Sequence, residues 1–183
     1  MKLLFFVLFG IYSSLTHANL QKEVLDLIKD QKSLTPKQIN SDSPKNLATV
    51  IYFLSSTCPC SQGHFDHLNS LQKSYPEFQF IGFHSSKSTP LKRAKRYFDQ
   101  FTIDFPIYLD KKLKAANLLK ALKTPHVFVL NQKGDFLFQG GATNSRNPKR
   151  ADQFYLQKAL SELKEGKPIE TKVARALGCY IQR

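Results

Sequence analysis

The sequence contains little cysteine, few acidic residues and, beyond its first residues, no long apolar run. Three cysteines among 183 residues are too few for a disulfide-stapled miniprotein. Only 14 Asp and Glu oppose 27 Lys and Arg, and the net charge of +13 permits contact with nucleic acid, anionic lipid or acidic partners. Hydrophobic residues at 42% and charged residues at 22% exclude collagen-like, coiled-coil and wholly disordered chains. The length suits one globular domain.

The one long apolar run lies at the N-terminus. Lys2 is followed by apolar residues over 3–12 and then by small and polar residues that end at Ala18. This order is typical of a secretory signal peptide, and the run is shorter than the roughly 20 residues that span a bilayer. We therefore expect residues 1–18 to be removed on export to a periplasmic or secreted location, without stable membrane insertion. Disulfides persist in such compartments.

The rest of the chain alternates between strand-like and helix-like patterns. The apolar, β-branched run 47–54 predicts a strand buried on both faces, in the middle of a sheet. Helices between successive strands favour parallel pairing, and the polar turn 131–135 favours an antiparallel hairpin. Further strands are expected at 78–84, 105–109, 127–130 and 136–138, and helices at 20–32, after the cysteine turn to about residue 75, and at 90–101, 112–122 and 152–164.

Two cysteines lie on the turn that follows the central strand. Cys58 and Cys60 flank Pro59, immediately before a predicted helix. A thiol reacts as its thiolate, and the N–H groups at a helix N-terminus favour that anion. Cys58, at the mouth of the turn, is therefore predicted to be a redox nucleophile rather than a buried structural thiol.

The order of these features resembles the thioredoxin fold over residues 46–164. In its Cys-Pro-x-Ser turn at 58–61 and its Gly-Cys-x-Ile at 178–181, the chain is similar to exported redoxin-like proteins of the alkyl hydroperoxide reductase and thiol-specific antioxidant group. The resemblance implies an α/β, thioredoxin-like fold with a central mixed sheet flanked by helices. Residues 19–46 would form an N-terminal helix and loop, 47–164 the domain and 165–183 an irregular C-terminal tail.

The sequence departs from two patterns of that superfamily. Ser61 stands where thioredoxins have their second cysteine, and the chain has no Trp. Ile51 and Ser55 stand where peroxiredoxins have Pro and Thr before the reactive cysteine. The second departure argues against peroxide reduction.

Thr124 and Pro125 directly precede a predicted strand. A proline cannot donate a hydrogen bond in the ladder of a central strand. It does suit a cis peptide bond that turns the backbone toward the cysteine turn, as in thioredoxin-like proteins. We predict this cis bond, with Thr124 in contact with Cys58 at an edge where an extended substrate pairs as an added strand. Thr57, Pro59 and His126 are the other expected substrate contacts, although His126 fits an exposed spacer equally well.

Cys179 is the predicted resolving cysteine. A Cys58–Cys60 disulfide would close a tight ring across Pro59, whose fixed φ leaves the sulfurs little freedom. Cys179 lies 15 residues beyond Lys164, the end of the last predicted helix, and an extended chain of that length could span on the order of 50 Å. Apolar residues around Cys179 could dock the tail. We predict that Cys179 packs near the turn and resolves the intermediate on Cys58, with Cys60 as competitor.

These features predict an exported thiol-disulfide oxidoreductase without a cofactor other than a redox-active disulfide. In this mechanism Cys58 attacks a disulfide, and Cys179 or Cys60 closes the cycle while Pro125 shapes the site. The expected partners are protein or small-molecule thiols and disulfides, together with a reductase. We expect a monomer that binds no nucleic acid.

Three alternatives stay open. A thiol peroxidase would pass through a sulfenic acid on Cys58. A Cu(I) chaperone of the Sco type would use Cys58, Cys60 and His64, because thiolates and imidazole bind copper; otherwise His64 and His67 are expected on the exposed side of their helix. A binding module without catalysis would rest on the basic and aromatic stretch 87–98.

Overall fold

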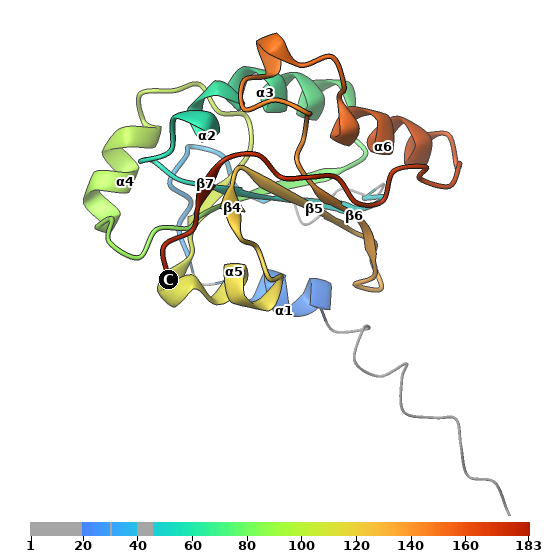
Figure 1. Ribbon diagram of the computed structural model, residues 1–183. Coiled ribbons are helices and arrows are strands. Elements are labelled where there is room, and N and C mark those ends of the chain that lie inside the picture. The colour runs from blue at the N-terminus through green and yellow to red at the C-terminus, as the bar shows by residue number, and fades with distance from the viewer. Residues whose placement is uncertain (1–19, 30, 40–45) are drawn as a thin grey trace, which may run out of the picture.

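A five-stranded mixed sheet forms the centre of the protein, with helices on both faces (Figure 1). The computed structural model describes residues 20–183 apart from residues 30 and 40–45, so the predicted signal peptide lies outside the described residues. The strand order is β3-β2-β1-β5-β6, in which the first three strands are parallel and the last two antiparallel to their neighbours. The predicted thioredoxin-like fold is confirmed. The bounds are β1 (Thr49–Leu54), β2 (Gln79–His84), β3 (Ile107–Leu109), β5 (His126–Leu130) and β6 (Phe136–Gly140).

The central strand β1 separates two apolar cores. It is buried along its whole length because it pairs with β2 on one side and β5 on the other. Side chains alternate across a strand. Val50, Tyr52 and Leu54 therefore enter one core, whereas Ile51 and Phe53 enter the other.

Helices cover these two cores from opposite sides (Figure 1). One face of the sheet carries α2 (Pro59–Gly63), α3 (Phe65–Ser74), α4 (Leu91–Phe98) and α6 (Tyr155–Lys164), and the other carries α1 (Leu20–Asp26) and α5 (Lys114–Leu118). The helix predicted over 112–122 is shorter than expected. Lys112, Leu113 and Lys120 have φ of 57°, 56° and 54°, and this left-handed backbone interrupts a right-handed helix on both sides. Among the described residues, no helix has the length and apolar character of a membrane span.

The C-terminal tail is mostly irregular, as predicted, but backbone hydrogen bonds attach it to the rest of the domain. The N–H of Gln139 donates to the carbonyl of Lys172 over 2.9 Å, and its carbonyl accepts from the N–H of Ala174 over 2.9 Å. Further along, β7 (Cys179–Tyr180) pairs antiparallel with β4 (Lys123–Thr124) as a small second sheet (Figure 1). The tail therefore crosses the sheet and returns to the strand that precedes β5.

Candidate functional site

The cysteine turn holds the side chain of Cys58 inward at the end of β1. Cys58 is the N-cap of α2 with an extended backbone, and Pro59 follows at the first helical position, where its missing N–H costs no hydrogen bond. The N–H of Ser55 donates to Ser61 Oγ over 3.1 Å and closes the turn. As a result Cys58 is only 2% exposed.

The loop before β5 reaches this thiol. The Thr124-Pro125 peptide bond is cis, as predicted. Cys58 Sγ lies 2.8 Å from the carbonyl oxygen of Thr124, to which a protonated Cys58 donates. The predicted contact between Thr124 and Cys58 is therefore confirmed.

The tail brings a second thiol to the same point. In the β4–β7 pair Cys179 stands opposite Thr124, and Cys179 Sγ lies 2.9 Å from Cys58 Sγ. A Cβ on Gly178 would lie 2.2 Å from the carbonyl oxygen of Thr124, so only glycine allows this close approach. The prediction that Cys179 packs near the cysteine turn is confirmed.

Cys60 completes a cluster of three thiols. The sulfurs of Cys58, Cys60 and Cys179 all lie within 4.8 Å of one another. Cys60 is half-buried, and Cys179 is the most exposed residue of the three. Both residues predicted to compete for Cys58 are thus close to it, and Cys179 makes the direct sulfur contact.

The cluster favours a negative charge on Cys58 and protons on its neighbours. Burial by itself raises the pKa of Cys58, but hydrogen bonds from the side chains of Cys179 and Thr124 and from the backbone of Cys179 and Ser61 outweigh it and lower that pKa to about 7. Burial and the nearby Cys58 raise the pKa of Cys179 to about 12. The same two causes raise the pKa of Cys60. Cys58 is therefore the thiol that ionises first.

Three residues around the thiols are not among those predicted from the sequence. Burial, followed by the charges on the cysteines, raises the pKa of Tyr52 on β1 and of Tyr97 on α4. Arg146 lies close enough to Cys60 to oppose the rise in its pKa. The alternation of side chains along β1 places Tyr52 on the face covered by α2, α3, α4 and α6. No motif in the sequence indicates Arg146.

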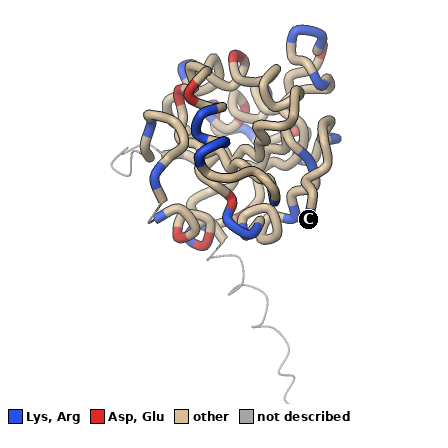
Figure 2. Tube along the Cα trace, turned by 90° about the vertical axis from the view of Figure 1, so that its left-hand side faces the viewer, with Lys and Arg blue, Asp and Glu red and all other residues tan. Residues whose placement is uncertain are grey.

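A basic surface lies beside this site. Figure 2 looks at the molecule from the side of α4, where Lys and Arg gather on that helix. The exposed residues are Lys92, Arg93, Lys95 and Arg96. This helix also carries Tyr97, whose pKa responds to Cys58. The excess positive charge of the chain thus extends to the neighbourhood of the thiols.

The expectation that His64 and His67 lie on an exposed helix side is wrong. His64 is 1% exposed, its Nδ1 lies 2.8 Å from the carbonyl oxygen of Cys60, and burial lowers its pKa to about 4. His67 is half-buried, with its ring 5.3 Å from that of Phe154. Phe154, just before α6, covers His67, whereas the His64 ring lies 6.5 Å from the ring of the buried Tyr52. In the described part of the chain, the metal-capable group at the turn contains Cys179 where the sequence suggested His64.

The remaining predicted contacts are spread around the turn. Thr57 and Pro59 are exposed, and Thr57 Oγ1 lies 2.9 Å from Ser55 Oγ. His126 is half-buried, accepts the N–H of Leu122 at Nδ1 over 3.3 Å and packs 4.5 Å from the Phe128 ring. Burial and then Lys123 lower the pKa of His126 to about 4, so this side chain is neutral at pH 7.

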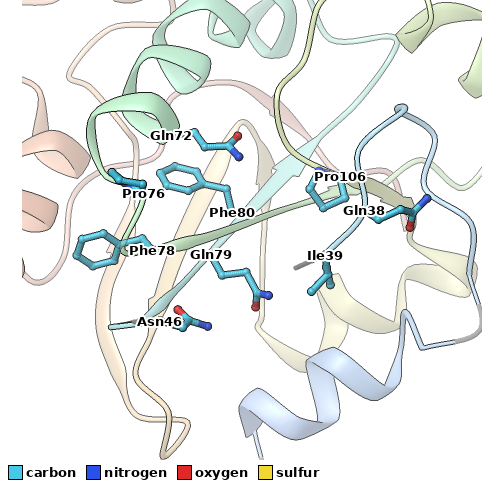
Figure 3. A pocket seen from close by; sticks show the side chains of 9 residues that line it. All are labelled: Gln38, Ile39, Asn46, Gln72, Pro76, Phe78, Gln79, Phe80 and Pro106. Carbon is cyan, nitrogen blue, oxygen red and sulfur yellow. The ribbon is translucent and has the colours of Figure 1, made fainter. Parts of the chain in front are cut away.

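A cavity of about 230 Å³ lies away from the thiols, where β1 and β2 begin (Figure 3). Cys58, in contrast, follows the end of β1. The cavity therefore does not belong to the thiol cluster. Its lining consists of Gln38, Ile39, Asn46, Gln72, Pro76, Phe78, Gln79, Phe80 and Pro106.

Comparison with known proteins supports the fold and leaves the activity open. A family model described as "Domain of unknown function (DUF6436)" matches residues 26–183. A comparison with curated proteins found no match. An uncharacterized conserved protein from Geobacillus kaustophilus has a similar structure, with a TM-score of 0.71, 21% identity and coverage of 83% of this chain and 86% of that one.

Two further solved structures share the architecture. A hypothetical protein from Sinorhizobium meliloti 1021 aligns with a TM-score of 0.67 and 20% identity over 75% of this chain and 80% of that one. A secreted Mycobacterium tuberculosis disulfide oxidoreductase, homologous to E. coli DsbE, aligns with a TM-score of 0.50 and 15% identity over 74% of this chain and 92% of that one. At these identities the likeness shows the thioredoxin-like fold.

Proposed function

The chain belongs to the family described as Domain of unknown function (DUF6436), and from its site we propose that it is a thiol-disulfide oxidoreductase with Cys58 as nucleophile and Cys179 as resolving cysteine. One observation carries the proposal: a buried thiol of lowered pKa lies 2.9 Å from a second thiol, on a strand that pairs with the cis-proline loop. The disulfide oxidoreductase of similar fold supports the same reaction class.

The reaction follows from the order in which the thiols ionise. The Cys58 thiolate attacks one sulfur of a substrate disulfide, forms a mixed disulfide and releases the other sulfur as a thiolate, which takes up a proton. Cys179 then loses its proton and attacks Cys58 Sγ. This step forms the Cys58–Cys179 disulfide and releases the second substrate thiol. The substrate gains two electrons and two protons, and this cysteine pair loses them.

Export is part of this proposal. The N-terminal pattern of residues 1–18 is that of a secretory signal, and a disulfide cycle suits an oxidising compartment. The similar Mycobacterium protein is described as secreted. Partners would be protein or small-molecule thiols and disulfides, together with a reductase, and the protein would act as a monomer without a cofactor and without binding nucleic acid.

Two activity assays test the reaction class. The purified protein should accelerate reduction of insulin disulfides, Cys58→Ser should fall to the uncatalysed rate, and the matched Cys60→Ser control should keep most of the activity. Cys179→Ser should accumulate a mixed disulfide on Cys58. Full insulin activity in Cys58→Ser would overturn the assignment, and turnover of peroxide without disulfide reduction would favour a peroxidase instead.

A soft metal ion is a second candidate ligand, because three sulfurs within 4.8 Å of one another suit Cu(I). The ligands would be Cys58, Cys60 and Cys179. Anaerobic titration of the reduced protein with Cu(I) should then show stoichiometric binding that is weakened by Cys179→Ser and unchanged by His64→Gln. Absence of tight binding, or binding that depends on His64 and not on Cys179, would refute this site.

A further inference from the structure

The tail occupies the edge of the cis-proline loop, where an extended substrate would pair. Thr124 and Lys123 use their strand edge to pair with Cys179 and Tyr180. A foreign strand cannot add at the same place while β7 is there. Cys58 is also only 2% exposed beneath this pair. With the tail docked, an incoming group therefore has little access to Cys58, so the attack of Cys58 on a substrate disulfide requires β7 to leave β4.

The docked position of the tail is held by the residues that follow β7. The N–H of Ile181 donates to the carbonyl of Leu122 over 3.0 Å, and the Ile181 side chain is 7% exposed within the second core. The guanidinium of Arg183 donates to Asn117 Oδ1 and to the carbonyl of Ala121. These contacts indicate that the tail is a specific part of the fold.

The two cysteines that would form the disulfide differ in their exposure to solvent. Cys179 is exposed, and its neighbour Tyr180 is 74% exposed. Within the described residues, β7 pairs with β4 on one side and with no strand on the other. An attacking thiol can therefore reach Cys179 from solvent more readily than it can reach Cys58.

We propose that an external thiol reduces the Cys58–Cys179 disulfide by attacking Cys179, so that the tail serves as a built-in substrate strand and carries the mixed disulfide. This inference rests on the proposed function. The thiolate R–S⁻ forms a bond to Cys179 Sγ, the bond between Cys179 and Cys58 breaks, and Cys58 leaves with the electron pair and takes up a proton. A second R–S⁻ then attacks the R sulfur, releases R–S–S–R and leaves Cys179 to take up a proton.

Trapping the mixed disulfide tests this inference. The full chain with Cys60→Ser, which leaves one possible internal disulfide, is oxidised, exposed briefly to reduced glutathione, quenched in acid and alkylated. Peptide mapping should find nearly all glutathione on Cys179 and the alkyl group on Cys58. Glutathione on Cys58 with Cys179 alkylated would overturn the proposal. A parallel experiment with a short single-cysteine peptide in place of glutathione should label the same cysteine. The reagent that reduces the disulfide faster shows whether small thiols or peptide thiols are the better reductants.

A variant pair separates the role of tail docking from general stability. Ile181→Ala removes a buried anchor of the tail, and glutathione should then be found on Cys58 in an amount comparable to that on Cys179. The matched control is Val173→Ala, at a residue that is 66% exposed, and it should keep the glutathione on Cys179. An unchanged label distribution in Ile181→Ala would contradict the role of the tail. If oxidation yields no Cys58–Cys179 disulfide at all, the proposed function fails; if the disulfide forms but is attacked at Cys58, only this inference fails.

Discussion

The contact between Cys179 and Cys58 predicts how Cys58 titrates. Among the groups that lower the pKa of Cys58, the side chain of Cys179 makes the largest contribution. A hydrogen bond to a charged group contributes about 1.5–3 kcal/mol, and 1.36 kcal/mol corresponds to about one pKa unit. Cys179→Ala should therefore raise the pKa of Cys58 by about one to two units above its value of about 7.

The expected rates follow from that shift. For a rise of one unit, the thiolate fraction at pH 7 falls from about a half to about a tenth. A more basic thiolate is also more nucleophilic, by about threefold per unit at a Brønsted coefficient of 0.4–0.5. The alkylation rate at pH 7 should therefore drop only about twofold, while the plateau at high pH should rise about threefold. The midpoint of the pH profile is thus a better measure than the rate at one pH.

Iodoacetamide alkylation of Cys58, followed by peptide mapping between pH 5 and about pH 10, measures this midpoint. The matched control is Cys60→Ala, which should shift the midpoint less than Cys179→Ala does, because Cys179 makes the largest contribution to lowering the pKa of Cys58. A midpoint in Cys179→Ala that stays at the wild-type value would refute the reasoning. So would an equal shift in both variants, since that would point to a general effect of removing a neighbouring thiol.

Three further predictions concern the tail, the charge of the site and stability. Gly178→Ala should slow formation of the Cys58–Cys179 disulfide, because its Cβ would clash with the Thr124 carbonyl. Gly63→Ala, whose Cβ would have its nearest contact 3.9 Å away, should form the disulfide at the wild-type rate. Alkylation of the remaining free thiols at timed intervals measures both rates. An anionic thiol should reduce the disulfide faster than a cationic thiol of similar size, with a gap that narrows as salt rises, because the chain has a net charge of +13; equal rates at low salt would contradict this. Relative to Cys58→Ser, the reduced protein should gain stability between pH 7 and pH 9, because Cys58 loses its proton in the folded chain before it does in the unfolded chain. It should lose stability above pH 9, because Cys179 and Cys60, whose pKa values are raised in the folded chain, ionise first in the unfolded chain; urea unfolding under reducing conditions measures both effects.

The central part of the site could be predicted because local sequence signals agree with the fold. The apolar run of β1 places the cysteine turn at the end of a buried strand, and a proline before β5 implied the cis bond that the structure contains. Apolar residues around Cys179 indicated a docked tail, and Ile181 is indeed buried. In each case a residue type has few alternatives: a long apolar run must be buried, and only proline makes a cis bond cheap.

The parts that sequence did not predict depend on which distant segments meet. His64 and His67 lie on a helix whose exposed side was predicted from its own residues, but Phe154, far along the chain, covers His67. Arg146 comes from a loop without a motif and reaches Cys60 only through the tertiary fold. The left-handed backbone at Lys112 and Leu113 has no sequence signal either, since neither residue is a glycine.

The pairing of β7 with β4 also makes the reduction potential of the Cys58–Cys179 pair depend on residues outside the cysteine turn. Cys179 is tethered beside Cys58, so its effective concentration depends on how firmly the tail is docked and not on a fixed spacing within a cysteine motif. For a two-electron couple, about 1.4 kcal/mol of docking energy corresponds to about 30 mV of reduction potential. Substitutions at anchors such as Ile181 could thus tune the disulfide from reducing toward oxidising while leaving every atom of the cysteine turn in place.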